Sequence, residues 1–345
     1  MKYFSIALKY IGKRGIPKAL LEDRIIKWSE NNHDAFECYP FSTGEITKKN
    51  INSQSFTNYF EALIRFDLIN EQAGLVLLSK NGAVLYEALK LLKESNSDDK
   101  YSISDVESFF YLNCIINKDF DLFVTVLMQL SNDPKMPISF YQLNFKAVYL
   151  EWLDSKRKLV QTQSDKVEIN DVISRVTEWK SPKRYSEDII PPRINWMADI
   201  GLIMVGSNNV FSLTNTGRAL VRESQLFVNS EGWLSTSLCS FFAKVFFNES
   251  VRFWSDLDEK EKTYSIGKAI DLSLDAFKVL GILRLSVDQS FLFMQIYLLF
   301  KLSTVVETKQ IGDWIGYEKI IGNKKIGLRK SARSYESYII VSYAQ

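Results

Sequence analysis

Two stretches of this chain repeat one succession of local patterns, and this repeat restricts the fold more than any other feature of the sequence. They cover residues 56–92 and 190–224. In each, an amphipathic stretch ends in Leu-Ile, a short polar turn and an apolar stretch follow, and Ser or Thr then stands three residues before Gly. The repeat predicts two modules that each contain a helix, a β-hairpin and a second helix.

Elementary stereochemistry supports each step of this pattern. Apolar side chains recur at the spacing of one helix face before each Leu-Ile pair: Ala62, Leu63 and Phe66 in the first copy, and Ile194, Met197 and Ala198 in the second. The polar turns at residues 72–74 and 206–209 contain Gly or Asn, which tolerate the positive φ of a tight hairpin. Ser79 and Thr214 are placed to cap the closing helices.

The sequence before each hairpin predicts the other helices of a helix-turn-helix. In the first copy, residues 18–28 are amphipathic, a capped helix start lies at Ser42 or Thr43, and residues 50–55 form a turn before the recognition helix. In the second copy we expect a helix at 169–176 and a turn at 180–186. Pro191 and Pro192 would then occupy the first turn of the recognition helix, where a missing N–H is tolerated.

These segments resemble a known superfamily. The stretches ALIRFDLI…LVLLSKNG and WMADIGLI…VFSLTNTG look like the helix, wing and closing helix of winged-helix proteins. The tandem arrangement is similar to the DNA-recognition domains of type IIS restriction endonucleases, over roughly 35 residues in each copy. The resemblance implies a DNA-recognition or DNA-sensing protein, such as the specificity subunit of a bacterial restriction or anti-phage system that works beside a separate nuclease or ATPase.

The expected fold is mainly α-helical with small β-hairpin wings, in tandem winged-helix modules joined by a helical scaffold. We assign residues 1–95 to the first module, 96–155 to a helical connector, 156–228 to the second module and 229–345 to a C-terminal helical domain. A third, divergent winged helix with a basic C-terminal hairpin is an alternative for this last segment. The connector is not expected to face phosphate, because residues 92–135 contain eight acidic side chains and four lysines.

The spacing of polar residues nominates DNA contacts. A recognition helix presents side chains near its N-terminus to base edges, while the preceding turn and the wing contact phosphates. The groove candidates are Gln54, Ser55, Thr57 and Asn58 in the first module, and Arg193 and Asn195 in the second. The phosphate candidates are Lys48, Lys49, Lys180, Lys183, Arg184 and Tyr185, with Asn208 on the second wing, and the basic C-terminal run adds Lys324, Lys325, Arg329 and Lys330. Double-stranded DNA is therefore the expected partner.

Any electrostatic attraction to DNA must be local, because the net charge of the whole chain is only +2. Residues 1–30 contain seven basic and three acidic side chains. Basic charge thus lies near the proposed modules, and acidic charge lies between them. This distribution favours phosphate binding, although a solvated basic surface would look the same.

Composition excludes several other classes of protein. The three cysteines lie far apart and the chain has a single histidine, so neither a disulfide framework nor a Cys/His metal site is predicted. No nucleotide-binding glycine motif occurs, and we expect no cofactor. The longest apolar run, residues 289–300, is too short to cross a bilayer and predicts a buried helix. We therefore expect a cytoplasmic protein without a membrane partner.

Two alternatives to DNA recognition remain. Winged helices also serve as protein-interaction adaptors, and Glu71 in the first wing would repel phosphate. The second alternative is a metal-dependent nuclease, because Asp288 is followed by Val305-Val306-Glu307-Thr308-Lys309, which matches the (D/E)-x-K pattern of metal-binding nuclease strands. The buried helix predicted between Asp288 and Glu307 argues against that site, and we expect no catalytic residues.

Overall fold

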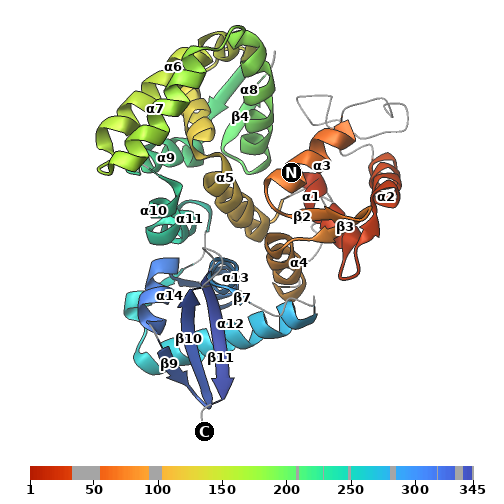
Figure 1. Cartoon of the computed structure of the whole chain (residues 1–345), viewed down its shortest axis with the longest axis vertical. Helices are drawn as coiled ribbons and strands as arrows, with labels where there is room; N and C mark the ends of the chain where they lie inside the picture. The colour runs from red at the N-terminus through yellow and green to blue at the C-terminus, as the bar shows by residue number, and fades with distance from the viewer. Residues whose placement is uncertain are drawn as a thin grey trace. The chain divides into compact units, whose positions relative to one another are not determined.

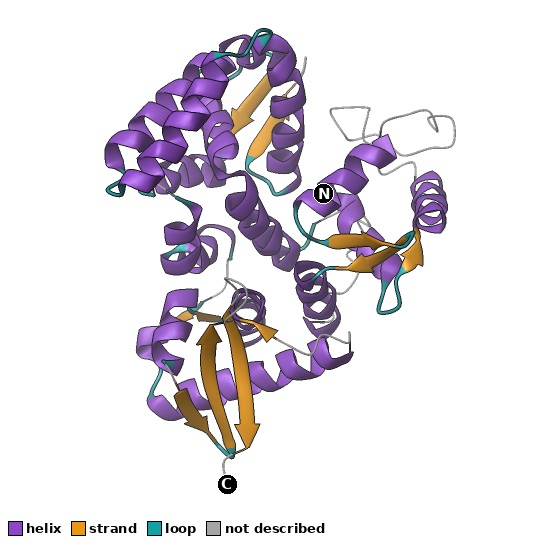
Figure 2. Cartoon of the chain, viewed as in Figure 1, coloured by secondary structure: helices purple, strands orange, loops and turns teal. Residues whose placement is uncertain are grey.

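The computed structural model describes residues 1–32, 55–92, 103–206, 210–227, 229–247, 250–279, 285–316, 318–330 and 337–343. These residues are mostly helical, with a few small sheets (Figure 2). They form two compact units: unit 1 combines residues 1–110 with 235–345, and unit 2 comprises residues 111–234. The first and last segments of the chain therefore share one unit.

The first part of unit 1, which we call the N-terminal module, is a set of helices around a three-stranded antiparallel sheet of order β1-β3-β2 (Figure 1). Its elements are α1 (Lys2–Ile11), β1 (Ile16–Pro17), α2 (Lys18–Glu30), α3 (Ser55–Arg65), β2 (Ile69–Gln72), β3 (Leu75–Leu78) and α4 (Lys80–Leu92). Aromatic side chains fill its core, where Phe4 packs edge-on against Phe66 and Tyr3 against Tyr59. The predicted helix at 18–28 and the predicted hairpin are both confirmed.

Unit 2 repeats this arrangement in a part that we call the central module, α6 to α9. The unit contains most of α5 (Asp105–Asn132), then α6 (Ile138–Leu159), α7 (Gln163–Thr177), α8 (Pro182–Asp199), β4 (Ile203–Gly206), β5 (Val210–Leu213), α9 (Asn215–Ser224) and most of α10 (Ser230–Thr236). Strands β4 and β5 are antiparallel, and Pro137 forms an isolated bridge to Val210. In the N-terminal module Pro17 pairs with Leu75 in the same way. Each proline also stands at the N-cap of the next helix.

The corner between helix and hairpin in the N-terminal module is fixed by the backbone around Leu68. Asp67 has a φ of 53°, which turns the chain out of α3. The Ser79 amide then donates to the Leu68 carbonyl oxygen at 3.1 Å, and the Ser79 hydroxyl accepts from the Gly82 amide at 3.1 Å. A methyl group on Gly82 would overlap the Leu68 carbonyl oxygen, so this position requires glycine.

The central module builds the same corner from equivalent atoms. Gly201 has a φ of 71°, the Thr214 amide donates to the Leu202 carbonyl oxygen at 2.9 Å, and the Thr214 hydroxyl accepts from the Gly217 amide at 3.0 Å. A methyl group on Gly217 would overlap the Leu202 carbonyl oxygen. The capping roles predicted for Ser79 and Thr214 are therefore confirmed, and the sequence repeat is a structural repeat.

The C-terminal part of unit 1 contains a four-stranded antiparallel sheet of order β7-β11-β10-β9 and a two-stranded parallel sheet of β6 and β8. Its elements are α11 (Leu238–Phe246), β6 (Arg252–Phe253), the short 3-10 helix η4 (Trp254–Asp256), α12 (Glu259–Val279), β7 (Leu285–Ser286), α13 (Val287–Leu302), β8 (Thr304–Val305), α14 (Thr308–Ile315), β9 (Glu318–Ile321), β10 (Lys324–Lys330) and β11 (Ser337–Tyr343). The predicted buried helix is confirmed as α13, whose residues 290–299 are all buried. Strand β11 pairs with β10 in antiparallel orientation over all seven of its residues.

Helix α13 also connects the two parts of unit 1, because α4 packs against it. Gln289 of α13 donates its side-chain amide to Asn81 of α4 at 3.0 Å. The Asn81 amide in turn donates to Asp67 at 3.3 Å, next to the corner described above. The N-terminal module is therefore anchored to the C-terminal core through its own corner.

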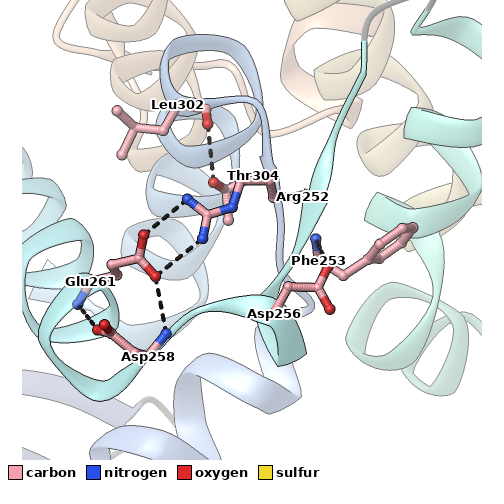
Figure 3. A network of polar contacts seen from close by, with 7 residues as sticks. All are labelled: Arg252, Phe253, Asp256, Asp258, Glu261, Leu302 and Thr304. Atoms are coloured by element: carbon pink, nitrogen blue, oxygen red, sulfur yellow. Dashed lines mark hydrogen bonds and ion pairs between the residues drawn. The ribbon is translucent and has the colours of Figure 1, made fainter.

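A surface network fixes the start of α12 to β8 (Figure 3). The Arg252 amide donates to the Ser303 carbonyl oxygen at 2.9 Å, and its guanidinium donates to both Glu261 oxygens at 2.9 and 3.1 Å. These bonds lower the pKa of Glu261. Glu261 and Asp258 also exchange hydrogen bonds with each other's backbone amides, which closes the first turn of α12.

Within the described part of the chain, no helix is both long enough and apolar enough to cross a membrane.

Candidate nucleic-acid interface

The turn between α7 and α8 brings together most of the basic residues predicted for the second module. Helix α7 ends at Thr177 and α8 begins at Pro182, so the turn spans only residues 178–181. Lys180 lies in this turn, and Lys183 and Arg184 lie in the first turn of α8. All three side chains are exposed.

An aromatic cluster holds this turn in place. Trp179 stacks on Tyr185 with ring centroids 4.9 Å apart and planes 22° apart, and it lies nearly parallel to Phe145 of α6 at 6.4 Å. Tyr185 nevertheless remains 47% exposed. The buried Ser186 hydroxyl lies 2.7 Å from the Gln142 carbonyl oxygen on α6. The basic side chains therefore extend from a rigid base, which reduces the entropy lost when they bind a ligand.

Acidic residues share this surface. Glu178, Glu187 and Asp188 are also exposed, and Glu187 lies 4.0 Å from Lys183. Within the described residues, neither Lys180 nor Arg184 forms an ion pair. These two cations are the ones most available to a phosphate.

The prediction of Arg193 as a groove contact is wrong, whereas that of Asn195, whose side chain is only partly buried, stays a prediction. Arg193 is 1% exposed and forms a buried ion pair with Asp119, which is 4% exposed. Its guanidinium also donates to the Ile189 carbonyl oxygen at 2.6 Å. The side-chain oxygen of Asn195 is buried and has no hydrogen-bond partner among the described residues.

The cause of this error is the position of the helix start. The sequence offers two places for proline in a first helical turn, Pro182 and the pair Pro191-Pro192. Helix α8 starts at Pro182, so the pair lies inside the helix and Arg193 occupies its middle. The turn predicted at 180–186 is correspondingly wrong, because residues 182–186 are helical.

In the N-terminal module, fewer of the residues predicted to contact DNA lie within the described part of the chain. Thr57 and Asn58 are exposed near the start of α3, and Ser55 is its first residue. Lys48, Lys49, Gln54 and Asn208 lie outside the described residues. Glu71 on the wing lies 3.3 Å from Lys18, so part of the charge expected to repel phosphate is compensated.

The four basic residues predicted at the C-terminus all lie on β10. Lys324 is paired with Asp271, and Lys325 lies 2.8 Å from Glu318. Arg329 is half-buried and Lys330 is exposed. The predicted basic hairpin is present as β10 and β11, but acidic neighbours compensate the charges of Lys324 and Lys325.

Glu307 of the nuclease pattern serves as a helix cap in the structure. The buried Glu307 carboxylate accepts hydrogen bonds from the backbone amides of Cys239 and Ser240, at 3.2 and 2.7 Å, and thereby caps α11. Gln295 donates to the Val306 carbonyl oxygen at 2.9 Å. Asp288 precedes Gln295 by seven helical residues, or about 10 Å of helix rise. Lys309 is exposed.

Burial also controls the chemistry beside this cap. The Cys239 thiol is fully buried next to Glu307, and both desolvation and the carboxylate raise its pKa. No group of three or more His, Cys, Asp or Glu side chains among the described residues could hold a metal ion.

Sequence reasoning gave Trp179 and Asp119 no role, although both organise this surface. The stretch Trp179-Lys180-Ser181-Pro182-Lys183-Arg184-Tyr185 has an aromatic residue at each end of a basic turn. That pattern was the available signal for Trp179. Asp119 precedes Arg193 by 74 residues, and no local pattern connects the two.

No protein-family model, curated protein or solved structure matches this chain.

Proposed function

We propose that this chain binds double-stranded DNA through two winged-helix modules. The repeated corner supports the proposal, because each module has a helix, an antiparallel hairpin and a closing helix joined by the same hydrogen bonds. Strand β1 adds a short third strand to the N-terminal module, as in a winged helix, and Pro137 makes an isolated bridge at the equivalent place in the central module. In this reading, α3 and α8 are the recognition helices.

The observation that carries DNA binding is the cluster of exposed cations around the start of α8. Lys180, Lys183 and Arg184 surround a four-residue turn, in the place where a helix-turn-helix contacts the phosphate backbone. The aromatic cluster beneath them fixes the turn before DNA arrives. Base contacts would come from the first turns of α8 rather than from Arg193.

The neighbouring acids limit the proposed affinity. Glu178, Glu187 and Asp188 reduce the local positive charge, so we expect moderate affinity and strong dependence on salt. The resemblance to restriction recognition domains suggests a specificity or sensing subunit of a bacterial restriction or anti-phage system, with a separate nuclease or ATPase as its protein partner.

Titration of a labelled duplex at several salt concentrations tests this proposal. The variant Lys180→Gln/Arg184→Gln should bind at least tenfold more weakly, and the slope of log K against log salt should fall by about 1.8, or 0.9 for each lost phosphate contact. The matched control is Lys118→Gln/Lys158→Gln, which removes two exposed cations of unit 2 outside the turn. Equal affinities of the two variants, or no duplex binding by the intact chain, would refute the proposal.

A protein-interaction adaptor is the second candidate function. Unit 2 exposes apolar side chains on the central module, including Met204 on the wing strand β4 at 56% and Leu143 on α6 at 73%. Such side chains favour contact with protein over contact with phosphate. If the intact chain copurifies with a partner that Met204→Glu releases, and has no affinity for DNA, this second function holds instead of the first.

A further inference from the structure

A groove in unit 1 lies between α12 and the turn that joins β9 to β10. It has a volume of about 750 Å³, and its walls include Lys260, Tyr264 and Lys268 of α12 and the turn residues Gly322 and Asn323. Gly267 lets this turn approach closely, because a methyl group there would lie 2.8 Å from the Ile321 side chain. None of these residues belongs to the proposed duplex-binding surface.

The α12 wall presents two cations with an aromatic ring between them. Lys260, Tyr264 and Lys268 follow one another at intervals of four residues, so they share one helix face over about 12 Å. All three are exposed, and Tyr264 is exposed to 65%. The Lys268 ammonium lies 5.8 Å from the centre of the Tyr264 ring.

The acidic residues of the groove are already compensated by other partners. Asp271 is paired with Lys324. Glu259 accepts a hydrogen bond from the Trp314 indole at 3.1 Å and lies 3.6 Å from Lys319. Lys260 and Lys268 form no ion pair among the described residues, so the groove has uncompensated positive charge.

We propose that this groove binds a single strand of nucleic acid. Lys260 and Lys268 leave the backbone of α12 about 12 Å apart, so their side chains can contact different phosphates of one strand. An exposed aromatic ring between cations is the arrangement that stacks an unpaired base while the backbone is neutralised. The groove is open to solvent rather than enclosed, which suits a chain that lies across it better than a small molecule that must be enclosed.

An acidic peptide would also be attracted by the two lysines, but its carboxylates would not stack on the Tyr264 ring as a base does. The ring therefore distinguishes the two ligands. Removal of the ring should weaken a nucleic-acid strand through lost stacking, whereas Phe should preserve that stacking.

The test measures fluorescence anisotropy of a labelled oligothymidylate of about ten nucleotides with the full chain. We expect Lys260→Gln/Lys268→Gln to weaken binding at least tenfold and to lower the salt slope by about 1.4, or 0.7 for each contact with a single strand. Tyr264→Ala should weaken binding about tenfold, and Tyr264→Phe should bind as the unmodified chain does. The control Lys278→Gln/Lys301→Gln removes two exposed cations of unit 1 that do not line the groove.

Two outcomes would overturn the inference. One is equal oligothymidylate affinity of the groove variant and its control. The other is displacement of the oligonucleotide by polyglutamate together with unchanged binding by Tyr264→Ala, which would assign the groove to acidic peptide. The variant Lys180→Gln/Arg184→Gln should keep its oligothymidylate affinity, so failure of the duplex proposal can be separated from failure of this one.

Discussion

Replacement of Arg193 by Met should destabilise unit 2 by about 3–5 kcal/mol without changing its affinity for DNA. Arg193 and Asp119 are 1% and 4% exposed and form an ion pair that joins α8 to α5. Met keeps the helix propensity and much of the side-chain volume. It removes the cation, however, and leaves the Asp119 carboxylate buried in surroundings that disfavour its charge.

The magnitude follows from burial. Removal of one member of a buried ion pair costs about 3–5 kcal/mol, whereas pairs at the surface contribute about 0–1 kcal/mol. The adjacent pair of Lys156 and Asp121 provides the control, because it joins α6 to α5 at 2.8 Å with the Asp121 side chain still 31% exposed. We expect Lys156→Met to cost about 1 kcal/mol.

Urea denaturation of the intact chain, followed by circular dichroism and tryptophan fluorescence, measures both effects. The double variant Asp119→Leu/Arg193→Met should recover most of the stability lost in the single variant, because it removes both buried charges. The reasoning is refuted if Arg193→Met costs no more than Lys156→Met. If Arg193→Met instead lost affinity for DNA while its stability was unchanged, Arg193 would be a base contact after all.

Replacement of Gly82 or Gly217 by Ala should lower the free energy of unfolding by about 1–3 kcal/mol, because the new methyl group would overlap a backbone carbonyl oxygen. Gly206→Ala is the control and should be nearly neutral. Equal unfolding midpoints of the three variants would contradict the required close approach. Burial raises the pKa of Tyr59 from 10.0 to about 12. The contribution of Tyr59 to stability should therefore be constant below pH 10 and fall by about 1.4 kcal/mol per pH unit between pH 10 and 12, and Tyr59→Phe should remove that part of the alkaline loss. Glu307→Gln should cost about 1–3 kcal/mol in denaturant, because its carboxylate caps α11, and a neutral effect would exclude that role. The buried Cys239 thiol should react with a thiol reagent only after unfolding, and reaction in the native chain would contradict its raised pKa.

Local chemistry was sufficient to predict the hairpins and their caps. As caps, the hydroxyls of Ser79 and Thr214 act within three residues of their own position. The Leu-Ile pairs lie just past the helix ends, and the Ile of each pair begins the first hairpin strand. The buried helix α13 could be predicted in the same way, because apolar residues on all its faces leave no side for solvent. Features that depend on nearest neighbours along the chain were therefore predicted correctly.

The start of α8 could not be predicted in this way. Pro182 and Pro191 both satisfy the local rule for a first helical turn, and the choice between them depends on packing against α5 and α6. Arg193 has the residue type of a DNA reader, yet Asp119 on another helix determines its environment. The same limit applies to Glu307, whose E-x-K pattern is local while its function as a cap depends on α11.

The two corners suggest how relatives of this chain can be recognised. Leu-Ile is followed by nine residues in one copy and ten in the other, then by Ser or Thr, two further residues and Gly. The hydrogen bonds at the corner require only a hydroxyl at the Ser or Thr position and no side chain at the Gly position. The sequence of the rest of each module can therefore vary. Two such corners in one chain, each preceded by a proline that starts a helix, define a signature that survives when overall sequence similarity has been lost.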